Sequence, residues 1–246
     1  MSFNQLDTTS NVEADKDYLG GAGVMESGLY DFTIKMMYGT VAASGAKAVN
    51  VTLESDSGQT LRQTIYITNA KGANYYVKDG KNYELPGFIT INSLCMLAGN
   101  KKFSDIAFED KVIPVYDYEQ KKELPTKVPV AVEMIGKKIT VGIIKQVVDK
   151  TKDSGQVDSK GKKVYVPTGE TREENEIDKI FRAEDGFTVA ELRAKSEKAE
   201  FKDQWATKNT GVTRNKSKGA PAGTTTGAPA TGTTGAPAAT QSLFDD

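Results

Sequence analysis

The chain has 246 residues, of which 38% are hydrophobic and 26% charged, and its formal net charge at pH 7 is −1. This composition allows one large domain, or one domain plus an appendage, with a real core, and no apolar run approaches the length of a transmembrane helix. There is no histidine and one cysteine, Cys95, which argues against Cys/His metal sites, histidine-dependent catalysis and internal disulfides. We therefore expect a protein that is not an enzyme, holds no metal or cofactor, and works in a reducing cytoplasm without membrane contact.

The first part of the chain predicts a meander of strands. Residues 1–27 are polar, lack the features of a secretory signal, and are expected to form a loosely packed lead-in. A period of two over Leu29–Tyr38 predicts a half-buried strand. Two further strands are predicted over 49–53 and 61–67, around a turn at 56–58. One face of the first strand should carry Tyr30, Phe32, Ile34, Met36 and Tyr38.

The middle of the chain gives mixed signals. Lys71–Tyr83 has no clean period and is interpreted as a loop that contains glycines, tyrosines and lysines. Leu85–Ala98 predicts a helix that ends at Gly99-Asn100, with Cys95 as a small hydrophobe on its apolar face. Val112–Tyr118 predicts an edge strand, because Pro114 cannot donate to a ladder.

The later part predicts a second hairpin and a helix. Alternation over Val128–Met134 and Ile139–Ile143 predicts two strands joined at Gly136-Lys137, followed by a solvated loop over 149–162 and a short strand over 163–166. The capping box Thr188-Val189-Ala190-Glu191 opens a helix. Val189, Leu192, Phe201 and Trp205 should pack it on the domain or form a dimer contact.

These elements indicate a mainly β protein with added helices. An elaborated five-stranded Greek-key barrel of the oligonucleotide-binding (OB) type fits the strand count, and a β-sandwich is the alternative. The expected organisation is the lead-in 1–27, an OB-like domain over 28–210, a linker over 211–242 and a tip over 243–246.

The same region that forms the meander gathers aromatic and basic side chains, whereas acids concentrate later, in 170–185 and 197–203. Single strands are bound by aromatic faces that stack on bases and by cations that follow phosphates. Tyr30 and Tyr38 are assigned to the core, and the acids of 170–178 to a solvated face. The candidate DNA-binding residues are Lys35, Lys47, Arg62, Tyr66, Lys71, Tyr75, Tyr76, Lys78, Lys81 and Tyr83.

The C-terminal tail is the most distinctive stretch. From Gly219 to Ser242 it is built from Gly, Ala, Pro and Thr with one Gln and one Ser, which predicts a disordered tether that spans roughly 25–30 Å on average. The chain then stops on two large apolar residues and two acids. We expect a short protein-interaction motif, formed by Leu243, Phe244, Asp245 and Asp246.

A β-rich core, a low-complexity tether and an acidic tip with an aromatic together resemble the single-stranded DNA-binding proteins of phages and bacteria. The stretches Thr171–Phe181 and Gly186–Glu191 resemble phage-encoded members, as does Glu26–Tyr30. Bacterial relatives usually end in a longer acidic run closed by Pro-Phe, whereas Phe244 here precedes two aspartates. This departure favours a phage-encoded partner over the host's usual tip receptor.

The resemblance implies protection of single-stranded DNA during replication, recombination or repair in the cytoplasm of an infected host cell. It also implies that the tip recruits a polymerase, helicase-primase or nuclease, and it leaves homo-oligomer formation open. The acidic tip is expected to visit the basic groove until a strand displaces it. Two other classes remain open: a β-rich virion structural protein, such as a tail or decoration component, and a carboxylate-dependent enzyme such as a nuclease.

Overall fold

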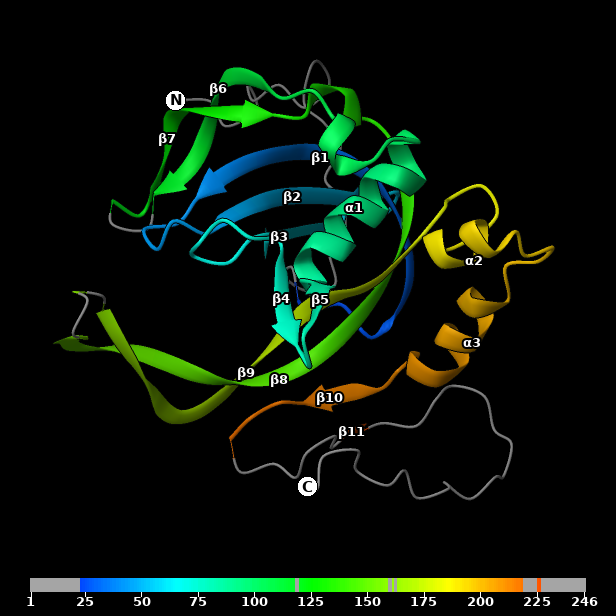
Figure 1. The fold of residues 1–246 in the computed structure, drawn as a ribbon. Helices are drawn as coiled ribbons and strands as arrows, with labels where there is room; N and C mark the ends of the chain where they lie inside the picture. Colours follow the sequence, from blue (N-terminus) through cyan, green and yellow to red (C-terminus); the bar gives the residue numbers. More distant parts are fainter. Residues whose placement is uncertain (1–22, 118–119, 159–160, 162, 219–224, 227–246) are drawn as a thin grey trace, which may run out of the picture.

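The computed structural model describes residues 23–117, 120–158, 161, 163–218 and 225–226 (Figure 1). Strands β1 (Gly28–Val41), β2 (Lys47–Ser55) and β3 (Thr60–Tyr66) form an antiparallel meander, as predicted. Its inner face is mainly apolar because alternate residues point to one side of each strand, and Gln63 is a polar residue on that face. Ile34 and Leu53 are 0% exposed there, and Leu61 lies opposite Leu53.

The predicted alternation in β1 is correct as far as Ile34 and wrong beyond it. A bulge between Ile34 and Met36 inserts one residue into the pairing with β2. Because one extra residue moves all later side chains to the other face, Met37 enters the core and Tyr38 faces outward. Tyr38 is therefore only partly buried and lies outside the core cluster, so its assignment to the core is wrong.

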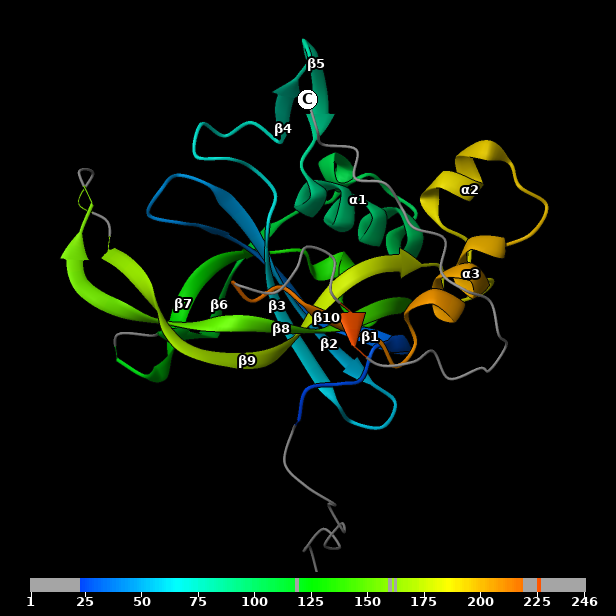
Figure 2. The same cartoon turned by 90° about the horizontal axis from the view of Figure 1, so that it is seen from below.

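The predicted loop 71–83 contains a hairpin. Strands β4 (Tyr75–Lys78) and β5 (Lys81–Glu84) pair with each other and form a separate two-stranded sheet that projects from the body (Figure 2). Asp79 and Gly80 both have positive φ, 52° and 71°, which is the geometry of a two-residue type I′ turn.

Helix α1 (Pro86–Gly99) confirms the predicted helix and covers the inner face of the meander (Figure 1). Ile91, Leu94 and Cys95 are 0% exposed, which confirms Cys95 as a buried small hydrophobe. Burial raises the pKa of its thiol to about 12. The residue that ends the helix in the left-handed conformation is Asn100.

The second predicted hairpin is wrong in its pairing. β6 (Glu109–Asp117) pairs with β7 (Lys122–Val130), and β8 (Lys138–Val157) pairs with β1 instead of with 128–134. The short 3-10 turns η2 (Phe103–Asp105) and η3 (Val132–Met134) connect these elements, and η3 buries Met134 in the core. Alternation indicated strands on both sides of Gly136 but carried no information about their partners.

A long hairpin replaces the loop predicted over 149–162. β8 continues to Val157 and returns as β9 (Lys163–Phe181), which includes the short strand predicted over 163–166. In the far half of this hairpin, from Asp149 to Thr171, most of the described residues are exposed. A strand that is polar on both faces lacks the alternation by which strands are recognised, and this explains the error.

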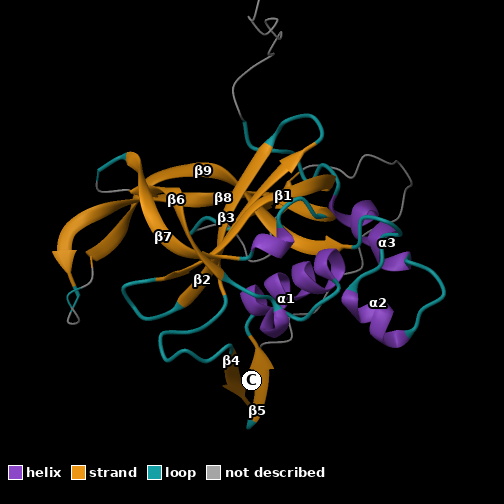
Figure 3. Cartoon of the chain, turned by 90° about the horizontal axis from the view of Figure 1, so that it is seen from above, coloured by secondary structure: helices purple, strands orange, loops and turns teal. Residues whose placement is uncertain are grey.

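The predicted terminal helix is two helices, α2 (Val189–Ala194) and α3 (Glu200–Asn209), because Lys195 is left-handed at φ 53°. The capping box is confirmed: Thr188 Oγ1 accepts from Glu191 N at 3.2 Å, and Glu191 Oε2 accepts from Thr188 N at 2.9 Å. All three helices lie on one side of the strands (Figure 3). Among the described residues, none of the helices is both long and apolar enough to cross a membrane.

Trp205 fixes the C-terminal segment to the body. Its ring is 4% exposed, packs at 6.2 Å from the Phe181 ring, and donates a 2.8 Å hydrogen bond to Asp178. Gly142 permits this contact, since a Cβ there would come within 2.8 Å of the indole. The chain then adds β10 (Thr213–Asn215) parallel to β8, inside the predicted linker 211–242, and β11 (Thr225–Thr226) beside β10.

The sheet is mainly antiparallel and is not closed by a backbone ladder within the described residues. Its strands follow the order β11-β10-β8-β1-β2-β3, with β9 on β8, β7 on β1 and β6 on β7. Between β3 and β9 the contact is made by a side chain: Gln63 Oε1 accepts from Ile177 N at 3.1 Å. The prediction of a mainly β fold with added helices is confirmed.

Candidate functional site

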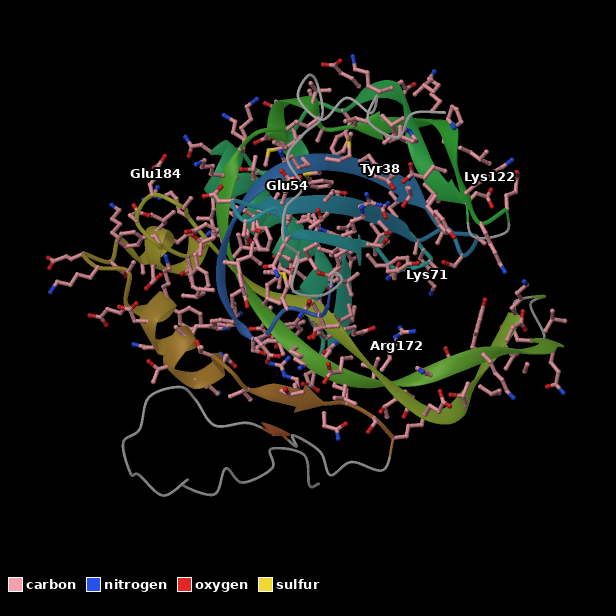
Figure 4. The ribbon with its side chains drawn as sticks, turned by 180° about the vertical axis from the view of Figure 1, so that it is seen from behind. Tyr38, Glu54, Lys71, Lys122, Arg172 and Glu184 are labelled. Carbon is pink, nitrogen blue, oxygen red and sulfur yellow. The ribbon has the colours of Figure 1, made fainter. Side chains whose placement is uncertain are left out.

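The outward face of the meander β1–β2–β3 carries part of the predicted site. Figure 4 shows the molecule from behind, with Tyr38 and Glu54 labelled near the strands of the meander. A polar ladder crosses all three strands: Asn50 donates to Thr40 Oγ1 at 2.9 Å and accepts from Thr64 Oγ1 at 2.6 Å. These hydrogen bonds fix three polar side chains, one from each strand, on this face.

Two predicted cations on this face are already paired with acids. Lys35 Nζ lies 2.7 Å from Glu54, and Arg62 Nη1 lies 3.8 Å from Glu123 of β7. All four side chains are substantially exposed, and exposed ion pairs typically contribute at most about 1 kcal/mol. Both cations can therefore leave their partners at little cost.

The β4–β5 hairpin brings four predicted residues onto one face. Paired residues of an antiparallel ladder share a face, so the pairs Tyr76–Tyr83 and Lys78–Lys81 lie next to each other. The two tyrosine rings stack, with centroids 5.7 Å apart and planes inclined by 26°. They remain 45% and 41% exposed. Tyr75 points to the opposite face of the hairpin, so the structure separates it from the other two tyrosines.

The root of the hairpin is fixed to the end of β3, where Tyr66 lies. Leu85 N donates to Asn74 O at 2.8 Å across the base of the hairpin. Gly87, in the first turn of α1, packs directly on the Tyr66 backbone, since a Cβ there would lie 2.1 Å from the Tyr66 carbonyl oxygen. Tyr66 itself is 54% exposed, so it lies at the junction between the outward face and the hairpin.

Lys47 begins β2, where its carbonyl oxygen accepts from Ile67 N just beyond β3, and Lys71 lies in the turn that leads to the hairpin. Within the described residues, Lys47, Lys71 and Lys81 form no ion pair. They are the predicted cations most available to an anionic ligand.

Sequence reasoning missed two exposed tyrosines. Tyr116 of β6 is 46% exposed and Tyr165 of β9 is 58% exposed, each on a hairpin that leaves the body. Neither position carries a local signal, because strands exposed on both faces lack the hydrophobic alternation that would show which side chains face solvent.

Tyr30 has the structural role predicted for it. Its ring packs 6.2 Å from Phe32, and its hydroxyl donates to the Glu26 carbonyl oxygen at 2.8 Å. Burial, followed by the charge of Glu26, raises its pKa.

The acids of β9 pair with cations of neighbouring segments. Glu173 lies 3.2 Å from Lys145, Glu176 lies 2.7 Å from Lys216, and Asp178 accepts from Trp205. The described residues contain no cluster of acidic or cysteine side chains that would hold a metal ion. Through Glu176 and Asp178, β9 therefore contacts Lys216 and Trp205 of the C-terminal segment.

The predicted interaction tip, 243–246, lies outside the described residues, as does most of the predicted tether. Comparison of the sequence with models of known protein families gives no match, and comparison with curated proteins gives none either.

Proposed function

We propose that this chain binds single-stranded DNA without sequence preference, across the outward face of the meander and the Tyr76 face of the β4–β5 hairpin. The observation that carries the proposal is the stacked, half-exposed pair Tyr76–Tyr83 beside two lysines. Aromatic platforms of this kind contribute about 1–3 kcal/mol for each base that stacks on them. Any base can use them, because every base has a flat face.

The charges on the surface support the same ligand. Lys47, Lys71 and Lys81 offer ammonium groups to phosphates, while Lys35 and Arg62 have weak acidic partners that a phosphate can replace. Neutralising phosphates releases counterions, so affinity should fall steeply with salt.

The strand order supports an OB-type barrel as the scaffold. β1, β2 and β3 form the meander, α1 follows it, β8 returns beside β1, and β9 pairs with β8. In this arrangement the β4–β5 and β6–β7 hairpins are elaborations. Gln63, which reaches Ile177, lies at the seam where such a barrel closes.

The biological setting is part of the proposal. We place the protein on DNA strands exposed during phage replication, recombination or repair, in the cytoplasm of the infected host. The tip 243–246 is proposed to recruit a polymerase, helicase-primase or nuclease to those strands.

The test is a titration of fluorescently labelled oligo-dT, followed by anisotropy at low and high salt, with duplex DNA as competitor. Saturable, salt-sensitive binding with weak competition from duplex is the expected result. No binding at low salt would overturn the proposal and favour the virion structural alternative, for which particle sizing would reveal large assemblies.

A further inference from the structure

The β6–β7 hairpin, here called the β6–β7 arm, spans the outward face of the meander. β7 meets β1 at the pair Val130–Tyr38 and then continues with β6 alone as its partner. Near the tip of the arm, Glu123 reaches Arg62 on β3. Since β2 lies between β1 and β3, the arm extends over the sheet from one side of the meander to the other.

The face of the arm that carries Glu123 also carries Tyr116. The two residues are directly paired in the antiparallel register, so their side chains point to the same side. Val112, paired with Lys127, shares this face. Val112 is 67% exposed and Tyr116 is 46% exposed, so the arm presents apolar surface beside the carboxylate that holds Arg62.

Two prolines make strand addition to the arm unfavourable. Pro114 and Pro125 are directly opposite each other, and neither has an N–H to donate to its partner. Their pair is therefore a non-hydrogen-bonded pair, and both nitrogens point to the outer edges of the hairpin. The outer edges of β6 and β7 therefore each lack one backbone N–H donor near the middle of the strand, which discourages pairing with a strand of another chain. The arm is suited to contact through its face.

We infer that the Tyr116 face of the arm is a further contact for the bound single strand, and that Glu123 occupies Arg62 in place of a phosphate until the strand arrives. This inference rests on the proposed function. Tyr116 supplies a stacking surface opposite the meander, and Arg62 passes from the carboxylate to a phosphate oxygen.

The exchange is favourable because the present pair is loose. Its shortest separation is 3.8 Å and both side chains are largely exposed, whereas a guanidinium binds phosphate through two parallel hydrogen bonds. When Arg62 leaves, Glu123 stays behind as a free anion and attracts a cation. Net ion release on binding is then smaller by about one ion.

The first test replaces Glu123→Gln and compares it with Glu109→Gln. Glu109 pairs with Lys111 on the opposite face of the same arm, so the control makes the same change in net charge without touching Arg62. We expect Glu123→Gln to tighten oligo-dT binding about two- to five-fold at low salt. The slope of log K against log salt should become steeper by about 0.7. Glu109→Gln should leave this slope unchanged.

A double-mutant cycle tests whether Glu123 acts on strand binding through Arg62. In an Arg62→Gln background, Glu123→Gln should no longer tighten binding. If the tightening persists there, or if both glutamine variants have the slope of the wild type, the exchange is overturned while the proposed function stands. If the wild-type protein does not bind oligo-dT at all, the proposed function fails and this inference fails with it.

The stacking role of Tyr116 is tested with one variant that removes the ring and one that keeps it. Tyr116→Ala should weaken oligo-dT binding by about five-fold or more, and Tyr116→Phe, which keeps the ring, should restore it. Thermal unfolding of both variants should match the wild type, because the residue lies on an exposed face. Equal affinity of the alanine variant and the wild type would remove Tyr116 from the binding path.

Discussion

The packed body and the three projecting hairpins differ in what they do with apolar side chains. In the body, Ile34, Leu94 and Ile139 are 0% exposed. In the β4–β5, β6–β7 and distal β8–β9 hairpins, Val77, Val112 and Val157 are 64–67% exposed. Two strands alone cannot cover either of their faces, so the hairpins add little to the core.

This difference separates stability from binding. Burial of apolar area supplies most of the folding free energy, so substitutions in the body should unfold the protein. Substitutions on the hairpins should leave unfolding unchanged and alter the contact with a strand. Two outcomes would contradict this division. One is a large change in the free energy of unfolding after a hairpin substitution, and the other is a loss of DNA binding after a body substitution that leaves the protein folded.

The largest effect should follow Trp205→Ala. It removes the indole from between Gly142 and Phe181 and leaves Asp178 without its 2.8 Å hydrogen bond, at a cost of about 3–5 kcal/mol. Urea unfolding should show a much lower midpoint. Phe201→Ala, at a ring that is 37% exposed, is the milder control. Equal midpoints for the two variants would mean that the C-terminal segment is not held by Trp205.

Gly87→Ala tests the junction between body and hairpin. The new methyl group would lie 2.1 Å from the Tyr66 carbonyl oxygen, so α1 and the end of β3 must move apart. We expect a loss of about 1–3 kcal/mol in the free energy of unfolding. Ile89→Ala, at a half-exposed position of the same helix, should cost less. If Gly87→Ala were the milder of the two, the hairpin root would be looser than the packing indicates.

The body was largely predictable from the sequence because one face of each strand is buried. Alternation over 49–53 and 61–67 indicated β2 and β3 correctly, and Leu85–Ala98 indicated α1. The bulge after Ile34 was not predictable, since it is a property of the pairing between β1 and β2. One inserted residue was enough to move Tyr38 from the predicted core to the outward face.

The hairpins were poorly predictable for the opposite reason. Strands exposed on both faces have no hydrophobic period, so 71–83 and 149–162 were interpreted as loops. Asp79-Gly80 is a sequence signal for a two-residue turn, but the flanking strands lack the alternation that would mark it as part of a hairpin. The contact between Arg62 and Glu123 joins residues far apart in the chain, and only the fold brings them together.

The next effect in size concerns the two faces of the β4–β5 hairpin. Tyr76→Ala and Tyr83→Ala should each weaken oligo-dT binding by about five-fold or more, because each removes half of the stacked pair. Tyr75→Ala is the matched control, on the opposite face of the same hairpin and equally exposed. Thermal unfolding should be unchanged in all three. If Tyr75→Ala weakened binding as much as the others, the hairpin would contact the strand with both faces.

The smallest effect on strand affinity should follow deletion of residues 243–246. The deletion removes two large apolar side chains and the acids Asp245 and Asp246, but none of the cations or tyrosines of the candidate surface. We expect acids at the end of a long linker to compete with phosphates for the same lysines, so their loss should leave oligo-dT affinity unchanged or raise it slightly at low salt. Recruitment of a replication partner should be lost, as measured by co-sedimentation of that partner on protein-coated single strands. Loss of strand binding itself would instead make the tip part of the strand-binding surface, and the division between a body that folds and appendages that bind would then have to include it.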